Sequence, residues 1–182
     1  MAIPTITDDR AKVAAFTGRS ADNDGNIIVD NADAAVCQDS RVALVTYSMG
    51  SCMAVSIWDP VAKVVGLLRY MFHDSSVAPE EAERNPAMFC DTGVPRLFSA
   101  AYGLGAEKRR LIVKVAGGSR LIANNKTFDI GLRNYLALRK IFWKNGVTIA
   151  AENVGGAVRR TMLVRASDGA VALKIRGKEA AL

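Results

Sequence analysis

The sequence predicts a single domain with a layered α/β (α+β) sandwich, in which β-sheets are flanked by helices. The chain has 182 residues, half of them apolar, which is enough for one sizeable core. Several short runs rich in β-branched and aromatic residues follow one another through turn-like sequences, as in hairpins. Two other segments have the apolar periodicity of amphipathic helices. These elements do not alternate regularly, which argues against a doubly wound parallel sheet.

The predicted strands begin after a polar N-terminal part. Residues 1–24 end in a loop-like sequence, so we expect a flexible extension there and one folded domain over residues 25–182. Asp59-Pro60 is typical of a turn between strands, and Ser167-Asp168-Gly169 is typical of a hairpin. Strands are expected over residues 27–29, 41–47, 53–58, 64–72, 111–116, 147–152, 160–165 and 170–175.

Two helices are expected, over residues 87–102 and 130–143. In each helix apolar side chains recur at helical spacing, and a glycine, Gly103 or Gly146, supplies the stop. The second helix has basic residues near its C-terminal end, where the helix dipole favours them. Residues 74–86 contain two prolines and several acidic residues, and we expect an exposed loop there.

The composition restricts the class of partner and the compartment. The net charge is +6 and the pI is about 9.4, which favours an acidic partner. The basic residues are dispersed and few aromatic residues accompany them, so we expect no nucleic-acid binding. No apolar run approaches the ~18 residues of a membrane span, and no secretory signal pattern is visible. We therefore expect a cytoplasmic protein with no membrane insertion. Three separated cysteines and one histidine have no metal-ligand spacing, so we expect no metal site.

Cys52 is the strongest candidate for chemistry. It lies in the stretch MGSCMAVSIWDP, directly after a Gly-Ser turn and between two predicted strands. A free cysteine is commonly a small buried apolar residue, and Cys52 is open to that interpretation as well. A turn between strands, however, can present a side chain with free backbone N–H groups nearby. Thiol catalysis needs such donors for an oxyanion, together with a base or cation that favours the thiolate.

The motifs around Cys52 and further along the chain resemble those of the CheD family of chemoreceptor glutamine deamidases. The resemblance covers about residues 27 to 175, and several motifs occur in the same order. The matching stretches are Thr46 with Gly50-Ser51-Cys52-Met53-Ala54-Val55, Asp59-Pro60-Val61-Ala62-Lys63-Val64, Lys114-Val115-Ala116-Gly117-Gly118, Ile130-Gly131-Leu132-Arg133-Asn134, Glu152-Asn153-Val154-Gly155-Gly156 with Arg159 or Arg160 after it, and the turn at Asp168-Gly169.

This resemblance implies a fold, an activity and partners. Proteins of this family have two mixed β-sheets, similar to toxin-type cysteine deamidases, and convert receptor glutamine to glutamate through a Cys-His-Thr centre without a cofactor. Ammonia is released and a thioester is formed on the way. The expected partners are cytoplasmic helices of chemoreceptors and, as for some members, the phosphatase CheC. By position, Cys52 is the nucleophile and Thr46 is the threonine, while Ser51, Gly117, Gly118 and Asn134 are expected to bind substrate.

One position departs from the family pattern. The family histidine lies seventeen residues after the cysteine, where this sequence has Arg69. Arginine favours a thiolate electrostatically but does not release its proton, so it is not a general base. The single histidine, His73, lies four residues further, or ~13 Å along an extended strand. Three interpretations remain: His73 folds back and the protein deamidates glutamine, the protein is a binding module without catalysis, or an Arg69-activated Cys52 performs other thiol chemistry such as redox sensing.

Overall fold

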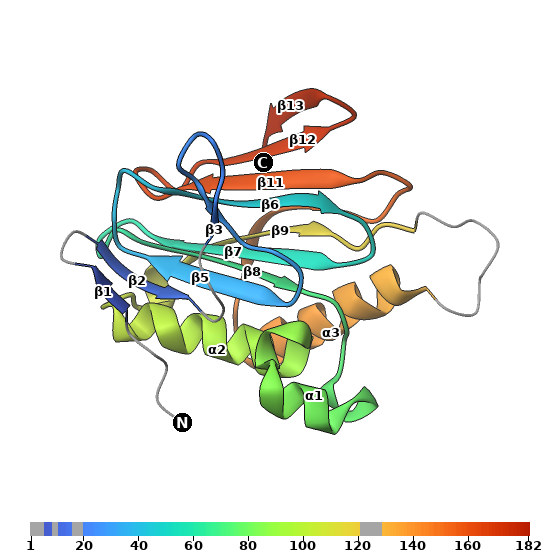
Figure 1. The fold of residues 1–182 in the computed structure, drawn as a ribbon. Helices are drawn as coiled ribbons and strands as arrows, with labels where there is room; N and C mark the ends of the chain where they lie inside the picture. Colours follow the sequence, from blue (N-terminus) through green and yellow to red (C-terminus); the bar gives the residue numbers. More distant parts are fainter. Residues whose placement is uncertain (1–5, 9–10, 16–19, 121–128) are drawn as a thin grey trace.

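The chain folds into three layers, which are a six-stranded sheet, a seven-stranded sheet and a layer of helices (Figure 1). The computed structural model describes residues 6–8, 11–15, 20–120 and 129–182, and the strand counts refer to these residues. The seven-stranded sheet has the spatial order β1 (Ile6–Asp8), β2 (Ala11–Ala15), β5 (Asp33–Cys37), β8 (Val64–Tyr70), β7 (Met53–Asp59), β9 (Ile112–Gly117) and β10 (Ile149–Val154). The six-stranded sheet has the order β13 (Lys178–Ala181), β12 (Val171–Ile175), β11 (Arg160–Arg165), β6 (Ala43–Met49), β4 (Ile27–Ile28) and β3 (Ser20–Ala21).

Both sheets are mixed. The pairs β9–β10 and β4–β6 are parallel, and the other named pairs are antiparallel. The parallel pair β9–β10 needs a crossover connection, and α3 (Ile130–Lys144) provides it. The predicted α+β sandwich with two mixed sheets is therefore confirmed.

The helices cover the face of the seven-stranded sheet that points away from the six-stranded sheet (Figure 1). They are α1 (Pro79–Arg84), α2 (Cys90–Gly103) and α3, with short 3-10 turns at Ser75–Val77, Pro86–Met88 and Lys108–Arg110. Side chains of β7 and β8 alternate between two cores, as strand geometry requires. Met53 and Tyr70 belong to the core under the helices, whereas Ala54 and Leu67 belong to the core between the sheets.

The predicted strands and helices are found, with boundary differences of a few residues, but several elements are additional. β5 was not predicted because its sequence, DAAVC, is mostly small residues, yet all five of its residues are buried. Residues 74–86 were expected to be a loop and instead contain α1. This prediction was wrong, because Pro79 at the first helical turn, with Glu80 and Glu81, is a helix-start signal.

The N-terminal part contributes strands as well. β1 and β2 extend the edge of the seven-stranded sheet through the pairing of β2 with β5, and β3 pairs with β4. The strands β1, β2 and β3 lie within residues 1–24, for which the sequence predicted a flexible extension. The division of the chain into this extension and a domain over residues 25–182 stays a prediction.

Candidate active site

Cys52 lies where the chain passes from one sheet to the other. β6 belongs to the six-stranded sheet and β7 to the seven-stranded sheet, so the connection between them spans the interface of the two sheets. Cys52 is half-buried on this connection, whereas the other two cysteines, Cys37 and Cys90, are buried. Cys52 is therefore the cysteine with the best access to solvent.

Three hydrogen bonds fix the backbone of the Cys52 turn. The backbone N–H groups of Gly118 and Ser119 donate to the carbonyl oxygens of Cys52 and Gly50, both at 2.9 Å. The side-chain amide of Asn134 donates to the Ser51 carbonyl at 3.1 Å.

Gly117 allows β9 to approach this turn closely. Its φ is +116°, a conformation that side chains disfavour, and a Cβ atom there would overlap the carbonyl oxygen of Cys52. Gly117 and Gly118, both predicted to bind substrate, are buried and shape the site through their backbone.

Asn134, also predicted to bind substrate, stabilises the backbone of the site through hydrogen bonds from α3. It projects from α3, is completely buried, and donates to the carbonyls of both Ser51 and Met71, the latter at 2.8 Å. Its backbone carbonyl accepts from the Tyr70 hydroxyl at 2.8 Å. Asn134 thus connects α3, the Cys52 turn and the end of β8, and its contact with Ser51 is through the backbone.

Arg69 and Thr46 meet between the two sheets. Arg69 on β8 is only 7% exposed, and its Nη1 donates to Thr46 Oγ1 at 3.2 Å and to the Tyr47 carbonyl at 2.7 Å. Its Nε has no hydrogen-bond partner among the described residues. In the strand register Arg69 is opposite Ala54, two residues after Cys52. Since alternate residues share a face, Arg69 and Thr46 lie on the side between the sheets, and Cys52 lies on the turn directly before β7.

His73 lies in a different place. After β8 the backbone N–H groups of Met71 and Phe72 donate to the Met88 carbonyl, so the chain leaves the sheet and turns toward the helices. His73 then lines a pocket of about 420 Å³ beside α3, together with Arg133 and Lys140. The described residues that line this pocket do not include Cys52. The structure therefore brings Thr46 and Arg69 into contact near the turn that carries Cys52 and places His73 with the helices.

Asn31, which no sequence pattern singled out, has a polar side chain that contacts the Cys52 thiol. Cys52 Sγ lies 3.8 Å from Asn31 Oδ1, so the protonated thiol donates to the amide oxygen. Asn31 precedes Ala32, which has a φ of +55°, and Ser48 near the other side of the site has a φ of +53°. Such angles are uncommon for residues with side chains and cluster at functional sites. The contact joins residues 21 positions apart, and no local pattern indicates it.

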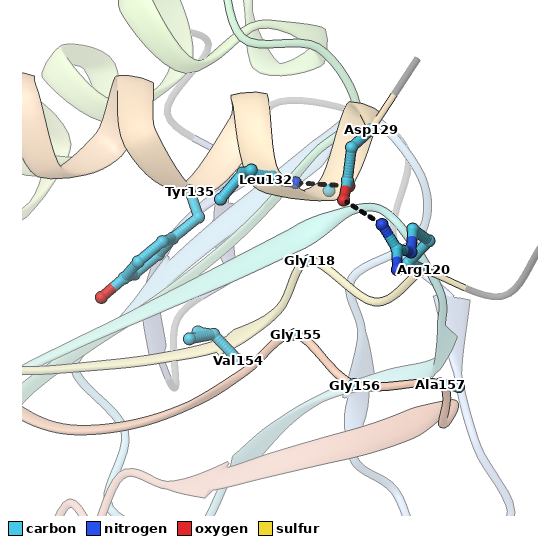
Figure 2. Close-up of a pocket in the computed structure, with 10 residues that line it drawn as sticks. Gly118, Arg120, Asp129, Leu132, Tyr135, Val154, Gly155, Gly156 and Ala157 are labelled. Carbon is cyan, nitrogen blue, oxygen red and sulfur yellow. Dashed lines mark hydrogen bonds and ion pairs between the residues drawn. The ribbon is translucent and has the colours of Figure 1, made fainter. Parts of the chain in front are cut away.

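A larger pocket of about 530 Å³ adjoins the backbone that holds Cys52 (Figure 2). Gly118, Gly155 and Gly156 form one wall, and the start of α3 forms the other. Figure 2 shows Asp129 accepting from the Leu132 N–H at 2.9 Å and pairing with Arg120 at 3.6 Å. The Asp129 carboxylate thus caps the N-terminus of α3.

A buried arginine supports the glycine wall. Arg160 is 4% exposed and donates to the carbonyl of Gly155 at 2.8 Å, to Asn153 Oδ1 at 2.7 Å, and to Ser119 Oγ. Burial lowers the pKa of this guanidinium below its ordinary value. Because Ser119 holds the Gly50 carbonyl, Arg160 links the glycine wall to the Cys52 turn.

The described residues contain neither a candidate metal cluster nor a candidate membrane-spanning helix. No cluster of three or more histidine, cysteine, aspartate or glutamate residues that could hold a metal ion occurs among them. Within the same residues, no helix has the length and apolar character needed to span a bilayer.

Comparison with known proteins points to a single family. The family described as CheD chemotactic sensory transduction matches residues 71–175. The chain is 46% identical over 153 residues to the probable chemoreceptor glutamine deamidase CheD 1 of Syntrophus aciditrophicus, covering 84% of this chain and 96% of that protein. It is also 46% identical over 153 residues to the corresponding protein of Solibacter usitatus, covering 84% and 90% of the two chains.

A third relative, the probable chemoreceptor glutamine deamidase CheD 2 of Anaeromyxobacter dehalogenans, is 38% identical over 148 residues, covering 81% of this chain and 93% of that protein. The family match begins after Cys52 and Arg69, at residue 71. Each of these three alignments covers more than four fifths of the chain and so necessarily includes both residues.

Proposed function

Because the chain belongs to the CheD family, we propose that it is a protein-glutamine deamidase of bacterial chemotaxis that converts glutamine side chains of chemoreceptors to glutamate. The observation that carries this proposal is the half-buried thiol of Cys52 on a turn that three hydrogen bonds hold in place. A nucleophile fixed in this way loses little conformational freedom when it attacks. The site of action would be the cytoplasmic helices of the receptors.

The reaction runs through a thioester. The Cys52 thiolate attacks the carboxamide carbon of the glutamine, so a C–S bond forms and the carbonyl oxygen becomes an oxyanion. The backbone N–H groups of Ser51 and Cys52 are the donors that would stabilise it. The C–N bond then breaks, and the nitrogen leaves as ammonia with the proton that the thiol gave up. Water attacks the thioester, the C–S bond breaks, and glutamate is released; no step transfers electrons to a cofactor.

Arg69 favours the thiolate but is not a general base. Arg69 pairs with Ala54, two residues after Cys52, and a positive charge near the thiol would favour the thiolate. It does not accept the thiol proton and does not deliver it to the leaving nitrogen. We therefore propose that the deamidase is slow, because proton transfer passes through water instead of a positioned histidine.

A second candidate function is favoured by the same arginine. Arg69 is buried and donates to Thr46 and to the Tyr47 carbonyl, so its guanidinium is held in the structure by the residue expected to assist catalysis. A site built in this way could serve binding alone. In this alternative the protein is a regulatory module that binds receptor helices or the phosphatase CheC without changing them.

The test is incubation with a purified cytoplasmic fragment of a chemoreceptor from the same organism, followed by mass spectrometry of its glutamine residues. Slow conversion to glutamate that disappears in Cys52→Ala and persists unchanged in His73→Ala supports the proposal. Conversion that is lost in His73→Ala would instead identify His73 as the base. A folded protein that captures the receptor fragment in a pulldown but converts no glutamine would establish the binding module.

A further inference from the structure

The outer surface of α3 carries apolar side chains that no described element covers. Leu132 is 49% exposed, Leu136 is 55% exposed and Trp143 is 81% exposed. At 3.6 residues per turn, positions separated by four and eleven residues lie almost in line along a helix. These three residues, here called the α3 stripe, therefore form one apolar line of about 16 Å, at a rise of about 1.5 Å per residue.

Basic residues flank this stripe. The sequence of α3, IGLRNYLALRKIFWK, has four arginine and lysine residues and no acidic residue. Arg133, Lys140 and Lys144 lie on one side of the stripe, and all three line the pocket that contains His73. Arg139 lies on the other side, where it contacts Tyr135 and Glu152. An exposed apolar line between cations is complementary to an apolar line between carboxylates.

The pocket beside the stripe, here called the groove, has a volume of about 420 Å³. It is lined by α3 on one side and by His73, Asp74 and Asp91 on the other. Leu136 and Ile141 contribute apolar surface to it. Asp91 is already engaged by the backbone N–H and hydroxyl of Ser75, at 2.9 and 2.6 Å. The pKa of Asp74 is lowered by hydrogen bonds from Ser76 and by the charges of His73 and Lys140. Positive charge thus prevails along the groove.

We propose that the α3 stripe and the adjoining groove are a docking surface for an acidic amphipathic α-helix of a partner protein. The helix would place leucine-like side chains against Leu132, Leu136 and Trp143, and carboxylates against Lys140 and Lys144. Trp143 is the anchor, since a large aromatic side chain contributes strongly to binding when it is covered. This surface lies on the helix layer, and its function does not depend on the reaction at Cys52.

Charge and shape favour this occupant over two others. A second copy of the chain would bring the four cations of one α3 against those of the other, and like charges disfavour such a contact. An anionic bilayer would attract the cations, but a flat membrane surface does not fill a pocket of this volume. A helix with glutamates on its flanks would pair with the cations, and its side chains would fill the pocket.

The surface is tested with a synthetic amphipathic peptide of about 20 residues, with leucines at positions i, i+4, i+7 and i+11 and glutamates beside them. Titration into the full-length protein is followed by Trp143 fluorescence, which shifts to shorter wavelength as the indole leaves water. Saturable binding at micromolar concentration that weakens with added salt is expected. The shift should be absent in Trp143→Phe, which separates it from any signal of Trp58.

Substitutions locate the site. Leu136→Glu and Trp143→Glu, compared by calorimetric titration because the second variant lacks the fluorophore, should each weaken binding at least tenfold. Val61→Glu, a matched change at a 70% exposed apolar residue in the turn between β7 and β8, should leave binding unchanged. A peptide with lysine in place of glutamate should not bind. Equal binding of both peptides overturns the proposal. So does sedimentation with phosphatidylserine vesicles in place of peptide binding, or a dimer in solution that Leu136→Glu dissociates.

Discussion

The guanidinium of Arg69 on β8 donates to Thr46 Oγ1 on β6 at 3.2 Å, and this contact joins the two sheets beside the turn that carries Cys52. A second bond from the same nitrogen, to the Tyr47 carbonyl at 2.7 Å, fixes the guanidinium further. The charged group that would tune the thiol is therefore also part of the contact between the sheets. Changes at these two residues should affect stability as well as chemistry.

Replacing Thr46 with valine should destabilise the protein. Valine has nearly the same shape as threonine but removes the acceptor, so a buried charged donor loses one of its partners. The expected loss in the free energy of unfolding is about 1–3 kcal/mol, measured by urea denaturation. Thr46→Ser keeps the hydroxyl and is the matched control. Equal stability of the valine variant and the wild type would mean that the contact has no net effect.

Replacing Gly117 with alanine should displace the Cys52 turn. The new Cβ would meet the Cys52 carbonyl oxygen, and the left-handed φ adds strain, so a loss on the order of 3 kcal/mol is expected. Gly103→Ala is the control, because nothing lies within 4 Å of a Cβ at that position. The native wild type should expose one thiol to a disulfide reagent, and its reaction rate should change in Gly117→Ala but not in Gly103→Ala.

Asp59 should make the free energy of unfolding decrease as the solution becomes acidic. Burial alone would raise the pKa of this carboxyl, but hydrogen bonds from Arg110 and from the N–H groups of Ala62, Glu107 and Val61 outweigh burial and hold it below its ordinary value. A lowered pKa in the folded state adds stability above the unfolded pKa of about 4, and this stability is lost as the pH falls further.

Asp59→Asn should therefore lower the free energy of unfolding at pH 7 by about 1–3 kcal/mol, since it removes the buried one of the two carboxylates that pair with Arg110 and leaves only Glu107. The variant should also lose less stability than the wild type between pH 4 and pH 2. Denaturation curves at several pH values measure both effects. Parallel pH profiles for the two proteins would contradict this role of Asp59.

Much of the layered fold follows from local patterns in the sequence. The runs around Val45, Val55 and Leu67 are rich in β-branched and large apolar residues, and they form the strands β6, β7 and β8. β5 escaped prediction because burial of its small side chains depends on neighbouring strands and not on propensity. The α1 sequence PEEAER, in contrast, contains local helix-start signals, so this helix is predictable from the sequence.

The candidate site depends on contacts between distant parts of the chain. Its clustered motifs indicated the Cys52 turn, Gly117 and Asn134, and the structure connects these three by hydrogen bonds and close approach. The contact of Asn31 with Cys52 and the position of His73 beside α3 arise from the way the strands pair and end. Neither the Asn31–Cys52 contact nor the position of His73 can be predicted from residue spacing along a single strand.

We propose that Arg69 occupies the place where a proton carrier would accelerate the Cys52 reaction. The most direct measurement is the rate of glutamine-to-glutamate conversion in a chemoreceptor fragment by wild type, Arg69→His and Arg69→Lys, each first shown to be folded by thermal denaturation. The histidine variant should be at least tenfold faster than wild type, because a positioned general acid–base typically contributes about 10²–10⁴-fold, and the lysine variant should not be. A folded Arg69→His protein that is no faster than wild type would contradict the claim.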